Sequence, residues 1–209
     1  MKKIASIFVG LVMVFLCATC ISAKGSSDDK VSETRSVSAF HSIEVESVAG
    51  VYFTQSDTYS LRVEGEKKWV DLTKCTVKDG VLLITWAEKG KKKTAKNVNR
   101  LSIYISAPDL QEVTFEGVGS FNCKSRLNLK NVKFDIQGVG SLNVADLHAR
   151  NVKITLEGVG SGELTVDCDR LDASVEGIGS LTLSGKARSA HISKDGIGSV
   201  STRRLKVGE

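Results

Sequence analysis

The sequence Glu116-Gly-Val-Gly-Ser120 occurs five times, with small changes, in the second half of this 209-residue chain and decides its fold. The other copies are Gln137-Gly-Val-Gly-Ser141, Glu157-Gly-Val-Gly-Ser161, Glu176-Gly-Ile-Gly-Ser180 and Asp195-Gly-Ile-Gly-Ser199. Their leading glycines follow one another at intervals of 21, 20, 19 and 19 residues. A near-constant period of this kind is typical of a repeat protein, in which each repeat forms one structural unit.

Apolar and polar residues alternate on both sides of each copy. Val132, Phe134 and Ile136 lead into the second copy, and Leu142 and Val144 follow it. A period of two predicts β-strands with one apolar face. A repeat of about 20 residues is too short to hold a crossover helix between parallel strands. Helical repeats are therefore excluded.

The repeat length is also near that of a leucine-rich repeat, which would need a recurring asparagine ladder. The asparagines at 122, 131, 143 and 151 do not recur at that place. We therefore predict an all-β fold, a right-handed parallel β-helix or solenoid with about 20 residues per coil. Equivalent strands of successive coils should pair in parallel, about 4.8 Å apart.

The Gly-(Val/Ile)-Gly-Ser sequences are predicted to form the corners of the coils. Glycine permits backbone angles that other residues avoid. We expect the Val or Ile between the glycines to point into the core, and the Ser hydroxyl to cap the corner. The predicted structural turn residues are Gly117, Gly119, Gly138, Gly140, Gly158, Gly160, Gly177, Gly179, Gly196 and Gly198.

The first 23 residues have the order of a secretory signal peptide. Lys2 and Lys3 precede the apolar run 4–21, and Ser22-Ala23 provides a small-residue cleavage site. We expect cleavage after Ala23 and export to the periplasm, the outer-membrane surface or the medium. Lipidation of Cys20, as in a bacterial lipoprotein, stays open as an alternative. No later segment is apolar enough to span a bilayer.

The remainder is predicted to form a flexible linker (24–34) and one solenoid domain (35–209), with irregular coils over 35–110 and regular repeats over 111–209. The segment from Arg35 to Phe53 reads as a degenerate strand, turn, strand unit. Further strands are expected at 61–63, 77–86 and 101–105, with a tight turn at 78–80. Residues 66–74 suit a short helix or a loop. The basic stretch 88–96 is interpreted as a solvated loop, with contact to an anionic surface as the alternative.

Charge and cysteine content narrow the function classes. Removing Lys2 and Lys3 from 29 basic residues leaves 27 against 24 acidic ones, a net charge of +3 that is too mild to predict a nucleic-acid partner. Three cysteines remain at 75, 123 and 168, so at least one cannot pair within the chain. Cys123 shares its offset from the leading glycine with core residues of later coils. We predict a buried Cys123 thiol that forms no disulfide with Cys168, because two coils separate them.

Chemistry-bearing residues are few. The histidines are His41, His148 and His191. His148 and Cys168 lie at equal offsets in adjacent coils and are predicted neighbours, although a nucleophilic pair would lack a third residue to orient it.

The residues that precede the leading glycines should stack in one column: Glu116, Gln137, Glu157, Glu176 and Asp195. We interpret this column as a solvated ladder partly offset by Lys133, Lys153 and Lys194, with Ca²⁺ binding as the alternative. No metal or cofactor site is predicted.

The chain resembles the DUF2807 family of bacterial proteins, described as auto-transporter adhesins with a head GIN domain. The resemblance lies in Arg35-x-Val-x-x-Phe40-x-x-Ile43-x-Val45, in Ile103-Tyr-Ile-Ser-Ala-Pro-Asp-Leu110 and in the serial glycine turns. It implies a secreted or cell-surface β-helical protein of Gram-negative bacteria and brings no catalytic motif with it.

Two functions remain. The first is a noncatalytic surface or envelope protein that binds a glycan, a matrix component, a cell-surface protein or another copy of itself through its solenoid faces. The second is a polysaccharide-active β-helical enzyme, whose paired acids would come from different coils. Outward positions are mostly Ser, Thr, Asn, Lys and short acids, and the chain has only 12 aromatic residues. Binding is therefore favoured over catalysis.

The last repeat predicts how the stack ends. The stretch Ser199-Val-Ser-Thr-Arg203-Arg204-Leu-Lys206 stands where earlier repeats have Leu-x-Leu or Leu-x-Val, so we expect polar and basic residues in place of core ones. Charge at an open edge opposes pairing with another chain. We expect a monomer or a small closed oligomer that associates through a lateral face rather than by endless stacking.

Overall fold

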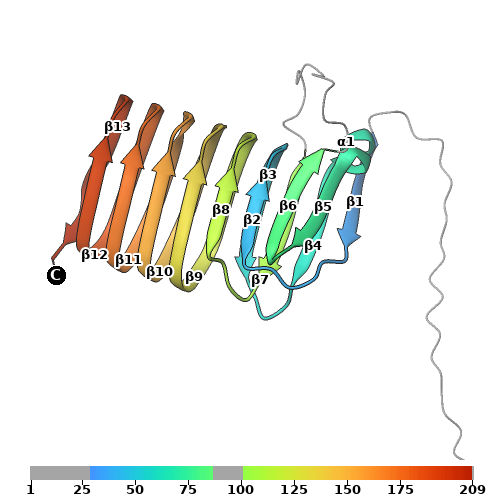
Figure 1. Ribbon diagram of the computed structural model, residues 1–209, viewed down its shortest axis with the longest axis horizontal. Helices are drawn as coiled ribbons and strands as arrows, with labels where there is room; N and C mark the ends of the chain where they lie inside the picture. Colours follow the sequence, from blue (N-terminus) through green and yellow to red (C-terminus); the bar gives the residue numbers. More distant parts are fainter. Residues whose placement is uncertain (1–28, 87–100, 209) are drawn as a thin grey trace, which may run out of the picture.

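The computed structural model describes residues 29–86 and 101–208 and is nearly all β. It contains thirteen strands and one short helix within these ranges. Figure 1 shows the coils stacked side by side along the long axis, with β13 at one end and β1 and α1 at the other. The predicted signal peptide, Cys20 and the basic stretch 88–96 lie outside the described residues.

The five glycine repeats form the regular part of the solenoid. Its strands are β9 (Val118–Ile136), β10 (Val139–Leu156), β11 (Val159–Val175), β12 (Ile178–Lys194) and β13 (Ile197–Val207). Each pairs in parallel with the next, and the glycine motifs lie in register. The prediction of a parallel solenoid with about 20 residues per coil is therefore confirmed.

The core is a set of apolar columns that run through the stack. Cys123 pairs with Val144, Val144 with Leu164 and Leu164 with Leu183, and all four side chains are buried. Full burial of such a side chain contributes about 1.5–3 kcal/mol relative to exposure. The predicted buried Cys123 thiol is confirmed, with a side chain that is 1% exposed.

The irregular half continues the same stack. Its elements are β1 (Lys30–Arg35), β2 (Ser42–Val45), β3 (Val48–Gln55), β4 (Ser60–Glu66), α1 (Lys67–Leu72), β5 (Thr73–Lys78), β6 (Val81–Trp86), β7 (Ser102–Ala107) and β8 (Glu112–Phe115). Strands β2 and β3 pair in parallel with β8 and β9, so the predicted degenerate repeat is a coil of the solenoid. The β5–β6 turn has positive φ at Asp79 (52°) and Gly80 (78°), as a tight hairpin turn requires.

The far end of this half is antiparallel. Strand β4 pairs antiparallel with β7, and β1 pairs antiparallel with β4. The predicted flexible linker 24–34 is therefore wrong for residues 30–34, which belong to β1. The edge of β4 supplies backbone partners for this segment, and Val31 packs against the core. An edge strand with one apolar residue gives too weak an alternation to be identified from sequence.

The corners differ from the prediction in which residue faces outward. The Val or Ile between the glycines is exposed in all five regular coils. The Ser lies two residues after it on the same face of the extended strand, and the acid lies before a bend at the leading glycine, where it is exposed as well. Expecting the Val or Ile in the core was therefore wrong.

The corner glycines lie against the preceding coil. A Cβ on Gly158 would stand 1.8 Å from the carbonyl oxygen of Gly138, although Gly158 has no left-handed φ. Contrary to the prediction, glycine is therefore not required at this position for its backbone freedom. It is required because it has no side chain, which lets the backbones of two coils approach closely.

Candidate functional site: a polar groove across the coils

An open groove of about 870 Å³ crosses three coils. It lies between the β7–β8 loop and outward positions of β9, β10 and β11. We call it the polar groove and define it by Pro108, Asp109, Gln111, Asn128, Leu129, Lys130, Asn131, His148, Ala149 and Asp167.

The strand register brings the polar groups of the groove together. His148 pairs with Asn128 on one side and with Asp167 on the other. Beside them, Leu129 pairs with Ala149, whose small side chain leaves space along the groove floor. The groove therefore presents polar groups above a short apolar floor.

Gln55 fixes the loop wall of the groove. Its Nε2 donates to the carbonyl oxygens of Pro108 (2.8 Å) and Asn128 (3.0 Å), and its Oε1 accepts from the backbone N–H of Asn128 (2.7 Å). One amide side chain thus ties β3, the β7–β8 loop and β9 together. Asn128, tied through its backbone, is itself one of the residues that line the groove.

A chain of charged contacts runs along the rim. The Arg126 Nε donates to Asp146 Oδ2 (2.7 Å), and Asp146 Oδ1 lies 2.9 Å from His148 Nε2. His148 Nδ1 lies 3.5 Å from Asp167 Oδ2, which is 3.2 Å from Lys186 Nζ. The hydrogen bond from Arg126 lowers the pKa of Asp146, so this carboxylate is ionised at neutral pH. Exposed pairs of this kind contribute little stability individually. Their effect is to hold His148 between two carboxylates.

The predicted neighbours His148 and Cys168 are not paired. A register shift between Val144 and Leu147 places His148 opposite Asp167, and Cys168 opposite Ala149. Burial raises the pKa of the Cys168 thiol to about 11, with the carboxylates of Asp167 and Asp169 adding to the effect. The thiol is therefore protonated at neutral pH, and the nucleophilic pair is contradicted.

The other candidate residues lie apart from the groove. His41 contacts Ser42 through Nδ1 (3.0 Å) beside the β5–β6 turn, and His191 pairs with Asp172 on β11. In the part of the chain that the structure describes, no group of three or more His, Cys, Asp or Glu side chains could hold a metal ion.

The predicted acid column is exposed in every coil. Two of the three lysines expected to offset it have other partners. Lys133 binds Glu112 (2.9 Å) and Asp135 (3.0 Å), and these hydrogen bonds raise its pKa. Lys194 donates to the Gly198 carbonyl (3.1 Å). These contacts therefore contradict the predicted pairing of Lys133 and Lys194 with the acid column.

Sequence reasoning missed the amides of the groove and its surroundings. Asn143 Nδ2 donates to Asn122 Oδ1 (2.9 Å), and Asn151 Nδ2 donates to Asn131 Oδ1 (2.6 Å). Each pair joins equivalent positions of adjacent coils. Their separations of 21 and 20 residues equal the local repeat, and this signal could have identified them.

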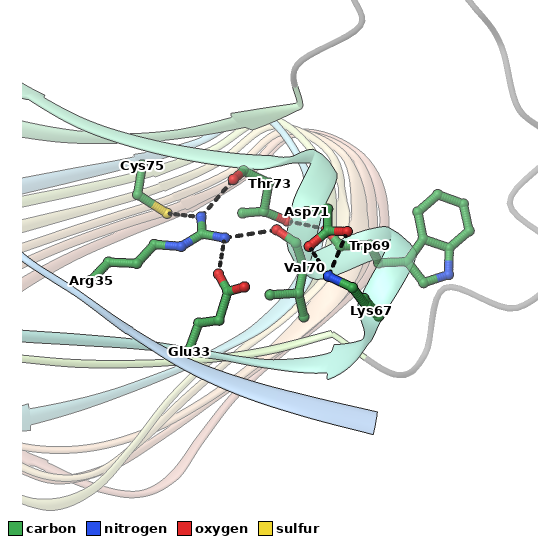
Figure 2. Close-up of polar contacts among 8 residues, drawn as sticks. All are labelled: Glu33, Arg35, Lys67, Trp69, Val70, Asp71, Thr73 and Cys75. Carbon is green, nitrogen blue, oxygen red and sulfur yellow. Dashed lines mark hydrogen bonds and ion pairs between the residues drawn. The ribbon is translucent and has the colours of Figure 1, made fainter. Parts of the chain in front are cut away.

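A second polar cluster, shown in Figure 2, lies at the N-terminal end of the stack. The Arg35 guanidinium donates to the carbonyl oxygens of Thr73 (2.5 Å) and Val70 (2.7 Å) and pairs with Glu33 (3.0 Å). It also lies 3.7 Å from the Cys75 Sγ, whose pKa is raised by burial and lowered in part by this charge. Since Arg35 binds carbonyls at the end of α1, this cluster is a structural clamp between β1, α1 and β5.

The comparisons agree with the architecture. A family model described as "Putative auto-transporter adhesin, head GIN domain" (DUF2807) matches residues 39–165 and 146–209. A solved "putative adhesin" from Bacteroides fragilis is 23% identical, with a TM-score of 0.66 over 84% of this chain and 97% of that one. A "putative lipid binding protein" from Parabacteroides distasonis is 19% identical, with a TM-score of 0.69 over 86% and 76%. At these identities the two structures show a shared fold. No curated protein matches the sequence.

Proposed function

Since this chain belongs to the DUF2807 family, we propose that it is an exported, noncatalytic protein of the cell surface or envelope. Its solenoid faces would bind a glycan, a matrix component or another copy of itself. The adhesin description of the family and of the Bacteroides fragilis structure supports a surface location. No helix in the described ranges is long and apolar enough to cross a bilayer.

The observation that carries the binding function is the polar groove. Its volume falls in the range of ligand sites, which is roughly 300–1,000 Å³. The amides of Gln111, Asn128 and Asn131 can both donate and accept hydrogen bonds. Sugar hydroxyls need partners of both kinds. Among the proposed ligands, the lining therefore favours a glycan.

The charges beside the groove support binding rather than glycoside cleavage. A glycosidase needs one carboxyl group with a raised pKa as general acid, opposite a second carboxylate. The contact with Arg126 lowers the pKa of Asp146 instead, and Asp167 is paired with Lys186. The two carboxylates are instead placed to position the His148 ring between them.

A glycan array followed by calorimetry with the purified mature protein tests the proposal. We expect binding of at least one glycan, at least tenfold weaker binding in Asn128→Ala and His148→Ala, and no release of reducing ends. Lys153→Ala, on the same strand as His148 but outside the groove, is the matched control. Binding that is unaffected by both groove variants, or steady hydrolysis of the glycan, would refute the assignment.

Export has its own test. Mass spectrometry of the protein made in a Gram-negative host should give a mature chain that begins at Lys24. An uncleaved chain in the cytoplasm would contradict export, whereas a chain that begins with a lipid-modified Cys20 would support an anchored envelope protein.

A further inference from the structure

One row of exposed apolar side chains runs straight along the solenoid. We call it the apolar ridge; it consists of Val118, Val139, Val159, Ile178 and Ile197, whose exposed fractions are 46, 51, 50, 54 and 74%. These are five of the seven exposed large hydrophobic residues in the described part of the chain. Single exposed apolar residues are ordinary, but a contiguous row indicates an interaction surface.

Two polar columns flank the ridge. On one side stands the acid column: Glu116, Gln137, Glu157, Glu176 and Asp195. On the other side stands the serine column: Ser120, Ser141, Ser161, Ser180 and Ser199. The pairing of Val139 with Val118 and Val159, and of Ile178 with Val159 and Ile197, keeps all three columns in register. The surface therefore repeats once per coil, at about 4.8 Å.

This periodicity identifies the occupant that fits the ridge best. A second copy of the chain carries the same repeat, so a match at one coil is a match at every coil. A membrane surface is a poorer fit, because the acid column would face anionic headgroups.

Charge selects the orientation of the second copy. A two-fold axis parallel to the solenoid axes places the acid column of one copy opposite the serine column of the other. Carboxylates then face hydroxyl donors. An antiparallel arrangement places acid column against acid column, which is repulsive. We propose that two copies associate ridge to ridge with their solenoid axes parallel.

The size of the ridge sets the expected strength. Four intervals of about 4.8 Å give a length of roughly 19 Å, and three columns span roughly 14 Å. The footprint is a few hundred Å² per copy, below the roughly 800 Å² of a standard interface. The association is therefore reversible. It deepens the self-binding part of the proposed function and does not depend on the polar groove, which the glycan experiment tests separately.

Disulfide trapping tests the orientation. Val139→Cys, Val159→Cys and Ile178→Cys are oxidised separately and run on non-reducing gels. In the parallel arrangement each variant cross-links to itself, because equivalent Cα atoms come within the roughly 7 Å that a disulfide allows. Lys153→Cys, away from the ridge, and the unmodified chain with its native thiols are the controls. Cross-linking confined to Val159→Cys and to mixtures of the other two variants would show an antiparallel pair and overturn the proposal.

Sedimentation velocity over a concentration series tests the association itself. The unmodified chain should shift toward a dimer at high concentration. Val159→Glu should stay monomeric with an unchanged circular dichroism spectrum, while the matched Lys153→Glu variant dimerises. A monomer at all concentrations, dimerisation that survives Val159→Glu, or binding to phosphatidylcholine vesicles in place of dimerisation would each contradict the proposal.

Discussion

At the scale of single residues, the glycines show how little space separates adjacent coils. A Cβ added to Gly158 would clash with the carbonyl oxygen of Gly138, and a Cβ added to Gly160 would clash with that of Gly140. At Gly50, in the irregular half, an added Cβ would lie 3.4 Å from its nearest neighbouring atom, which is an ordinary contact distance. The two positions therefore make a matched pair for mutation.

We expect Gly158→Ala to destabilise the protein by about 3 kcal/mol, because overpacking forces the coils apart. Gly50→Ala should stay within about 0.5 kcal/mol of the parent. Urea denaturation followed by circular dichroism measures both. Equal stabilities of the two variants would mean that close approach is not the reason for glycine at this corner.

The buried thiols give a second prediction at this scale. The pKa of Cys168 is about 11, so its thiolate fraction should rise about tenfold per pH unit from pH 7 to pH 9. An ordinary thiol, with a pKa of about 8.5, would begin to level off in that range. Iodoacetamide labelling of the folded protein, read out peptide by peptide by mass spectrometry, follows each cysteine. A labelling rate of Cys168 that levels near pH 8.5 would contradict its burial.

At the scale of elements, the N-terminal end of the stack depends on a clamp. Arg35 lies on β1 and holds the last carbonyls of α1 and the start of β5 with a side chain that is only 20% exposed. Trp69 of α1 stacks on Trp86 of β6 at 5.4 Å between ring centroids. The Arg35 contacts thus join β1, at the edge of the sheet, to α1 and to the start of β5 (Figure 2).

Arg35→Ala should destabilise the protein by about 2 kcal/mol, because two charge-assisted hydrogen bonds to buried carbonyls are lost. Arg35→Lys should recover only part of this, since one ammonium cannot span both acceptors. Arg170→Ala is the control, because the exposed Arg170–Asp172 pair contributes little. Thermal unfolding followed by tryptophan fluorescence reports the change. A loss in Arg170→Ala as large as in Arg35→Ala would argue against the clamp.

At the scale of the whole molecule, the stack has one open parallel edge in the described part, along β13 (Figure 1). The exposed Arg203, Arg204 and Lys206 lie on this strand. Like charges at two such ends repel, so the protein should associate through its sides and not end to end.

Replacing Arg203 and Arg204 by Thr should increase end-to-end association several-fold at low salt. Light scattering and negative-stain microscopy would detect it as elongated end-to-end dimers. The unmodified chain should form none. Fibres from the unmodified chain, or no change in the double variant, would show that charge does not protect this end.

The sequence by itself determined the coil length, the strand character and the register of the glycine motifs. Each of these depends on a local pattern: the recurrence of the glycine motif and the alternation around residues such as Val132 and Leu142. Core positions followed from equal offsets, as the buried Cys123 shows. The short helix and the Asp79-Gly80 turn were also within reach, because turn chemistry is local.

Only the tertiary structure decided what lies beside what. One register shift between Val144 and Leu147 moved His148 from Cys168 to Asp167. The groove joins a loop near residue 108 to strands from three later coils, and β1 depends on the free edge of β4. The outward face of Val159 became clear only once the coils were stacked. Bulges and close backbone contacts throughout the stack determine which residues of adjacent coils become neighbours, and no local pattern of residues encodes their combined effect.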